Sequence, residues 1–157
     1  MAIPIVEQIA AKIKTKLETI TIANGYNVTV KSVSRPTRLG EDWKPQNLAV
    51  RMIQDDSARL ETDEAHMFAE REQLWAIILF VVPSDSSTDA VDTTKNLFQS
   101  DVEKALMADP QWGGLAMDSI VLDFNQFEAE NGEFEGVVVI YRVHYRTLEN
   151  NPYSQGA

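Results

Sequence analysis

The residues best suited to chemistry lie in an acidic stretch near the middle of the chain. His66 stands among carboxylates, namely Glu61, Asp63, Glu64, Glu70 and Glu72. Carboxylate oxygens with one imidazole could hold a divalent cation, since hard cations take oxygen ligands. The stretch lacks the regular ligand spacing and the glycine turn of a calcium loop, however. We therefore interpret it as an exposed acidic turn and expect no bound metal.

Other catalytic arrangements are missing from the sequence. There is no cysteine, which removes a thiolate nucleophile and thiolate metal ligands together. No Gly-x-Ser-x-Gly elbow occurs, and Gly113-Gly114 is not followed by the Lys-Ser/Thr of a phosphate-binding loop. His144 alternates with Arg142 and Arg146, which favours a row facing solvent or a partner over a metal site. We expect neither an enzyme nor a cofactor-binding protein.

The composition limits the partners of this chain. Its net charge of −10 argues against wrapping nucleic acid, because neutralising phosphates requires clustered Lys and Arg. The absence of cysteine fits a reducing compartment. The first residues lack the features of a signal peptide, and the longest apolar run, residues 74–83, is too short to span a bilayer. We expect a soluble protein, made in a cytoplasm, without a membrane partner.

Hydrophobic periodicity predicts a helix and then strands in the first half of the chain. Apolar residues recur every four positions from Ile5 to Leu17, which predicts a helix over residues 4–21. Alternating patterns predict strands at residues 26–31 and 48–53. Residues 73–82 are apolar on both faces, which is typical of a central strand. Between the last two strands, residues 55–64 read as an acidic turn or hairpin tip.

A long loop is predicted between the first two strands, at residues 34–47. It carries two prolines, Gly40 and mixed charge, and loops of this length usually have a role. Trp43 in this loop packs on the core edge or serves as an anchor at a subunit interface, where Trp is enriched. The loop also holds one of two short basic groups. These groups are Lys12, Lys14 and Lys16 on the first helix, and Arg35, Arg38 and Lys44 in the loop.

The second half predicts one helix and a hairpin. Ser87 or Thr88 can cap a helix that ends at Asp109-Pro110. Lys95 is the one polar residue in the apolar stripe of this helix. Strands are predicted at residues 119–128 and 136–146, joined through Asn131-Gly132, a strong hairpin signal.

These elements predict an α+β fold, in which two helices pack on one largely antiparallel sheet in the order α-β-β-β-α-β-β. We expect one domain over residues 1–147 and a polar tail over residues 148–157, which becomes ordered only on assembly. The expected core comprises Ile9, Ile13, Leu17, Trp75, Ile77, Leu79, Phe98, Val102, Leu106, Val139 and Tyr141.

The order of elements resembles the tail-terminator and tail-completion (minor tail) proteins of long-tailed bacteriophages. The resemblance covers an opening amphipathic helix, Asn24-Gly25-Tyr26 before the first strand, and a long loop. It continues with a second helix ending near Ala105-Leu106, the turn Trp112-Gly113-Gly114-Leu115, and a last strand ending in Tyr145-Arg146-Thr147.

This resemblance implies a structural virion protein without catalytic residues. Such proteins form a ring, usually a hexamer, that caps the tail tube, ends tube polymerisation and provides the docking surface for the neck. The implied partners are other copies of the chain, the tail-tube protein and a neck or head-completion protein. DNA would pass through the lumen unbound, and an acidic lumen would favour this by repelling phosphates. Acidity could equally serve only to keep the free subunit soluble.

We predict that the assembly interface includes Arg35, Arg38, Trp43, Lys44, His144, Arg146 and Tyr153. Two alternatives to a tail terminator remain open at this point. One is a head-closure, connector or other minor tail protein. The other is a soluble bacterial binding module or small enzyme.

Overall fold

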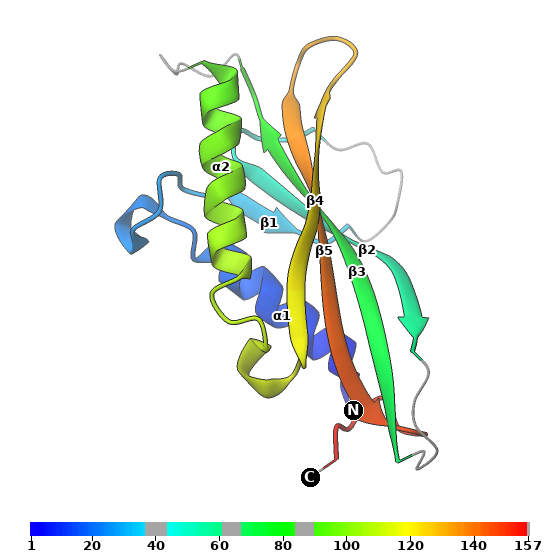
Figure 1. Ribbon diagram of the computed structural model, residues 1–157. Coiled ribbons are helices and arrows are strands. Elements are labelled where there is room, and N and C mark those ends of the chain that lie inside the picture. Colours follow the sequence, from blue (N-terminus) through cyan, green and yellow to red (C-terminus); the bar gives the residue numbers. More distant parts are fainter. Residues whose placement is uncertain (37–43, 61–66, 84–89, 157) are drawn as a thin grey trace.

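The computed structural model describes residues 1–36, 44–60, 67–83 and 90–156, and has the α+β architecture that the sequence predicts. Two helices pack on one face of a five-stranded sheet (Figure 1). The helices are α1 (Ile5–Glu18) and α2 (Val91–Leu106). The strands are β1 (Ser32–Ser34), β2 (Ala49–Arg59), β3 (Phe68–Val81), β4 (Asp118–Glu128) and β5 (Glu135–Leu148). Two short 3-10 turns, η1 (Ile22–Asn24) and η2 (Trp112–Gly114), follow the helices. Within the described ranges, no helix is long and apolar enough to cross a membrane.

The sheet has the strand order β1-β2-β3-β5-β4. Its centre is the antiparallel pair of β3 and β5, which runs from Phe68 opposite Leu148 to Val81 opposite Glu135. At one edge, β4 pairs only with β5. At the other edge, β1 is parallel to β2 and covers only its first three residues. Among the described residues, both edges therefore leave backbone groups available for pairing with another chain.

The predicted core is confirmed. All eleven core residues expected from the sequence are at most 1 % exposed. They come from α1, α2, β3 and β5, which shows that the apolar stripes of both helices face the same side of the sheet. The opposite face of the central strands carries the residues of the other parity, such as His144 and Arg146 on β5.

The strand predicted at residues 26–31 is wrong, because these backbone groups bond to α2. The carboxylate of Asp101 accepts hydrogen bonds from the backbone N–H groups of Asn27 (2.8 Å) and Val28 (2.9 Å). It also accepts one from the Asn27 side-chain amide (3.1 Å). Asp101 is 2 % exposed, so the burial of its charge requires these donors. The first strand instead begins at Ser32.

Other predicted boundaries also move. Strand β2 continues to Arg59, through much of the region expected to be an acidic turn, and β3 begins at Phe68, ahead of the apolar run at residues 73–82. Helix α2 begins at Val91 after Ala90, and no side chain caps it. The expected caps Ser87 and Thr88 lie outside the described residues. A bulge near Gln54 keeps β2 and β3 paired beyond the predicted turn.

The C-terminal segment, predicted to become ordered only on assembly, lies against the domain in this structure. Leu148 is still part of β5, and its backbone N–H donates to the Ser154 carbonyl (2.7 Å). The Pro152 carbonyl accepts from the N–H of Ile5 at the start of α1 (3.1 Å), and Figure 1 shows the two termini close together. The Gln155 amide donates to the Leu115 carbonyl (2.7 Å). The N–H of Ile5, in the first turn of α1, has no acceptor within the helix, and the Pro152 carbonyl of this segment provides one.

Truncating a core side chain tests the packing of the helices. We expect Leu17→Ala and Phe98→Ala each to lower the free energy of unfolding by about 2–5 kcal/mol, since both side chains are fully buried. Urea denaturation measures this change. Ile22→Ala, at a side chain that is 65 % exposed, is the control and should stay within about 0.5 kcal/mol of wild type. Changes that small at both core sites would contradict the helix orientations.

Removing the C-terminal segment tests its place in the fold. Deletion of residues 152–157 should lower the melting temperature by about 2–4 °C or more, because the N–H of Ile5 loses its acceptor. Thermal unfolding followed by circular dichroism measures the shift. Tyr153→Ala should leave the melting temperature unchanged, as that side chain is 47 % exposed. An unchanged melting temperature in the deletion variant would restore the expectation of an independent tail.

Candidate assembly interface

Of the basic residues predicted in the loop, the structure describes Arg35 and Lys44. Arg35 forms a two-pronged ion pair with Glu7 of α1, at 2.6 and 3.2 Å, and its guanidinium lies 5.5 Å from the ring centre of Trp75. Its charge is therefore used inside the subunit, where it ties the end of β1 to α1. Lys44 is exposed. Arg38 and Trp43 lie outside the described residues.

The predicted residues on β5 lie on the face of the sheet away from the helices. His144 Nε2 is 3.3 Å from a Glu70 carboxylate oxygen, and the Arg146 guanidinium lies 4.5 Å from the ring centre of Phe68. Tyr153 is exposed in the C-terminal turn. The predicted residues thus fall into separate places: Arg35 beside α1, His144 and Arg146 on the open face, and Tyr153 near the termini. The described members of the predicted set therefore lie on different parts of the subunit surface.

No metal centre is visible in the described parts of the chain, which hold no group of three or more His, Asp or Glu residues arranged around a common point. Of the acidic stretch considered above, only Glu70 and Glu72 are described. Glu70 pairs with His144 across the sheet, as an ordinary cross-strand neighbour pair.

An exposed apolar edge is the feature that sequence patterns did not single out. Strand β4 has its outer side free, and Ile120 (41 % exposed) and Leu122 (46 % exposed) project from it. Met117, just before the strand, is 40 % exposed. The strand contains no Lys or Pro, although exposed Asp118, Asp123 and Glu128 interrupt its apolar residues. Exposed apolar side chains on an edge strand favour contact with another chain.

A bulge places these side chains differently from Phe124, which follows them. The register of β4 against β5 shifts between Val121, opposite Tyr141, and Asp123, opposite Ile140. Leu122 is the extra residue, so the alternation of Ile120, Leu122 and Phe124 expected from the sequence is interrupted. Phe124 packs against the core side, whereas Ile120 and Leu122 stay exposed.

A buried lysine fixes the β4–β5 hairpin to α2. Lys95 is 5 % exposed, and its ammonium group lies 3.2 Å from Glu135, 3.2 Å from Gln126 and 3.4 Å from Asp92. Burial lowers the pKa of Lys95, but the two carboxylates outweigh this and hold the pKa above its ordinary value. Lys95, the polar residue in the predicted apolar stripe of α2, thus holds the hairpin in position against this helix through its contacts with Gln126 and Glu135.

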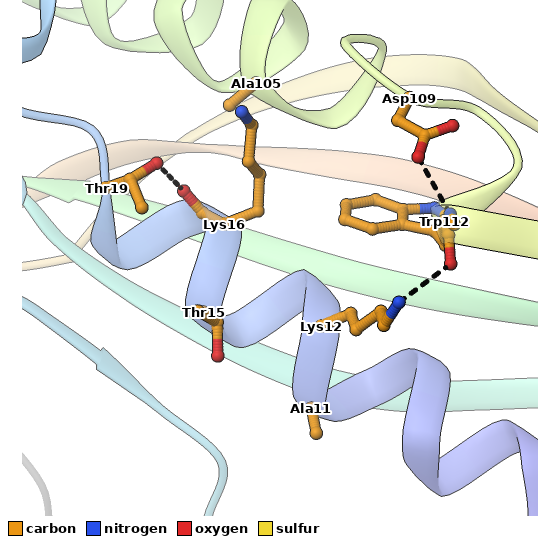
Figure 2. Close-up of a pocket in the computed structure, with 9 residues that line it drawn as sticks. Ala11, Lys12, Thr15, Lys16, Thr19, Ala105, Asp109 and Trp112 are labelled. Carbon is orange, nitrogen blue, oxygen red and sulfur yellow. Dashed lines mark hydrogen bonds between the residues drawn. The ribbon is translucent and has the colours of Figure 1, made fainter. Parts of the chain in front are cut away.

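A groove lies between α1 and the turn that follows α2. Its volume is about 470 Å³, and its lining includes Lys12 and Lys16 of α1, Ala105 of α2, and Asp109 and Trp112 of the turn. We call it the α1–α2 groove. Figure 2 shows the Lys12 side chain extending from α1 towards Trp112 of this turn, and the Lys16 side chain extending towards Ala105 of α2. Lys12 donates to the Trp112 carbonyl (3.3 Å), and Asp109 accepts from the N–H groups of Gln111 (3.2 Å) and Gly113 (2.8 Å).

The floor of the groove is held by a buried hydrogen-bond chain. The Trp112 indole N–H donates to the Tyr141 hydroxyl (2.9 Å), which donates to the Leu106 carbonyl (3.1 Å). These bonds link the turn, the central sheet and the end of α2. Trp112 has a φ of 49°, a left-handed conformation uncommon for an aromatic residue, and Gly113 and Gly114 follow with positive φ. Burial raises the pKa of the Tyr141 hydroxyl to about 12.

Sequence reasoning identified the turn but not the groove, since a groove requires two helices to be placed side by side. The three lysines of α1 were recognised as a basic group; only the fold separates Lys12 and Lys16, which line the groove, from Lys14. Neither a scan against protein-family models nor a search of curated proteins finds a match to this chain.

The buried tyrosine gives a testable pH dependence. In the unfolded chain a tyrosine ionises near pH 10, whereas Tyr141 in the folded protein ionises near pH 12. The folded state therefore holds this proton more tightly than the unfolded chain does. The resulting contribution of Tyr141 to the free energy of unfolding is complete below about pH 10 and is lost between about pH 10 and 12. Over that window we expect a loss of roughly 2–3 kcal/mol from Tyr141.

Urea denaturation of wild type and Tyr141→Phe between about pH 8 and pH 11.5 measures this contribution. The variant should be less stable at pH 8 by about 1–3 kcal/mol, because the Trp112 indole loses its acceptor. Its stability should fall less steeply above pH 10. Lys95 and Tyr145, whose pKa values are also raised, supply the slope that remains. Equal slopes in the two proteins would show that Tyr141 does not titrate as a buried group.

Proposed function

We propose that this chain is a structural virion protein of a long-tailed bacteriophage and acts at the tail–neck junction. Its copies form a ring that caps the tail tube, ends tube polymerisation and provides the docking surface for the neck. On the pattern of the family it resembles, the ring is a hexamer, its further partners are the tail-tube protein and a neck protein, and DNA passes through the lumen.

The observation that carries this proposal is the free apolar edge of β4. An eleven-residue edge strand that exposes Ile120 and Leu122 is suited to cover by another chain. A contact that uses one surface on each subunit and a different surface on its neighbour closes into a ring when the rotation allows it. The order of elements, which resembles the tail-terminator proteins, points to the same kind of assembly.

The acidity of the chain agrees with a passage for DNA. At a net charge of −10 per subunit, a ring of copies would be strongly negative. A negative lumen repels phosphates, so the genome could slide through without adhering.

Assembly of phage tails in the absence of this protein tests the proposal. Tail tubes of uncontrolled length, seen by electron microscopy, are the expected result. Tails of normal length that fail to join heads would assign the chain to a connector role instead. Intact particles of normal length would overturn a role at the junction altogether.

Adding protein back tests the edge itself. Wild type should restore tube length, whereas Ile120→Lys/Leu122→Lys should not, because charges on the edge oppose its cover by a neighbour. The control is Ile22→Lys, which places one charge on another exposed apolar residue, in the turn after α1. Melting temperatures of all three proteins should agree within a few degrees. Full restoration by the edge variant would show that β4 is not part of the interface.

A further inference from the structure

Charged residues are unevenly distributed along this chain. From Ala105 to Tyr141 there are seven acidic residues and no Lys, Arg or His. This segment forms η2, β4, the loop after it and the first half of β5. By contrast, α1 carries Lys12, Lys14 and Lys16. A molecule with opposite charges on different surfaces attracts other copies of itself head to tail.

Ion pairs within α1 leave two of its charges available. Glu18 pairs with Lys14 at 2.6 Å, and Glu7 pairs with Arg35 at 2.6 Å. In the described part of the chain, neither Lys12 nor Lys16 forms an ion pair. Both line the α1–α2 groove. The lining holds two ammonium groups and one carboxylate, that of Asp109, so the formal charge of the groove is positive.

The other end of the sheet carries the complementary charge. We define the hairpin tip as residues 128–134, which contain Glu128, Glu130 and Glu133, all exposed. The tip is held in shape by a hydrogen bond from the Ala129 N–H to the Phe134 carbonyl (2.9 Å), and the Phe134 ring packs edge-on against Phe80 (5.7 Å between ring centres). The three glutamates form no ion pair among the described residues. The tip is thus a rigid acidic projection.

We propose that the hairpin tip of one copy docks in the α1–α2 groove of the next copy. This inference rests on the proposed ring and names its contact surfaces. The tip cannot reach the groove of its own chain: Trp112 in the groove precedes β4, and the tip follows it. Eleven strand residues separate them by about 35 Å, and Figure 1 shows η2 and the hairpin loop at opposite ends.

The groove has a volume of about 470 Å³, within the roughly 300–1,000 Å³ of clefts that hold small molecules, so it has room for side chains of the tip but not for the whole tip. The glutamates of the tip would meet Lys12 and Lys16, while the apolar part of a hairpin would contact Ala105 and Trp112. A hairpin tip alone buries less than the roughly 1,200 Å² of a stable interface. Ile120 and Leu122, on the same hairpin, supply the remaining apolar contact with the neighbour.

Charge reversal on each side tests the docking. The groove variant is Lys12→Glu/Lys16→Glu, and the tip variant is Glu130→Lys/Glu133→Lys. Each alone places like charges on both sides of every contact and should weaken association at least about tenfold. In an equimolar mixture, the reversed tip meets the reversed groove and the natural tip meets the natural groove. The mixture should therefore assemble into even-numbered rings in which the two variants alternate.

Native mass spectrometry and sedimentation velocity, with isolated tail tubes present where the free subunit is monomeric, give the readout. Lys14→Glu/Lys31→Glu makes the same charge change outside the groove and should assemble as wild type does. Melting temperatures establish that each variant is folded. Association of wild type should also weaken several-fold when NaCl is raised from about 50 to 500 mM, since the contact is partly exposed.

Every outcome of these measurements either supports or overturns the docking of the tip in the groove. Assembly of either folded variant as well as wild type overturns the docking, and so does failure of the folded mixture to assemble. If the groove variant self-associates normally but no longer caps tubes, the groove binds an acidic partner other than a second copy, and the inference is wrong. Failure of wild type itself to oligomerise or cap tubes would instead refute the proposed function.

Discussion

The antiparallel pairing of β3 with β5 is the constraint on which the rest of this structure depends. The two strands are paired over fourteen positions, and their residues of odd number form the floor on which both helices pack. Because successive side chains alternate between faces, a slip of one residue would bury the charged row of β5 and expose Trp75 and Tyr141. The remaining strands attach to this pair from either side. The positions of both free edges follow from it.

Buried polar groups then fix how the other elements attach. Asp101 accepts two backbone N–H groups from the segment before β1, Lys95 joins α2 to the β4–β5 hairpin, and Tyr141 joins the turn at Trp112 to the end of α2. Each group is nearly or fully buried, so losing any one partner would leave an unsatisfied polar atom in the interior. These bonds specify one arrangement of the helices and the hairpin. A rigid hairpin and a fixed groove are what a repeated contact between copies requires.

Exposed features of the molecule can be understood together as surfaces for self-assembly. The apolar edge of β4 and the acidic hairpin tip belong to one segment, and the groove with Lys12 and Lys16 lies at the opposite end of that strand. Apolar contact would supply affinity, while the charges would select orientation, since a head-to-head approach brings like charges together. In the proposed role, closing a ring on a tail tube would require this directionality.

The sequence by itself determined the α+β class, the order of elements and the core, because side-chain periodicity records which face of each helix or strand is buried. It also determined the division of charge along the chain. Only the tertiary structure decided what those residues do. The pattern of residues 26–31 is that of a strand, yet Asp101 from α2 takes their backbone donors.

The same limit applies to the candidate interface. Arg35 is predicted at a subunit contact, and the structure adds that it pairs with Glu7 of its own chain. Lys12 and Lys16 line a groove that exists only because α1 lies beside the turn after α2. Strict alternation would put Leu122 and Phe124 on the same face of β4, but the bulge at Leu122 separates these two side chains. In each case the deciding contact joins residues far apart in the chain. Local sequence encodes burial, but the pairing of distant charges and donors is settled by packing.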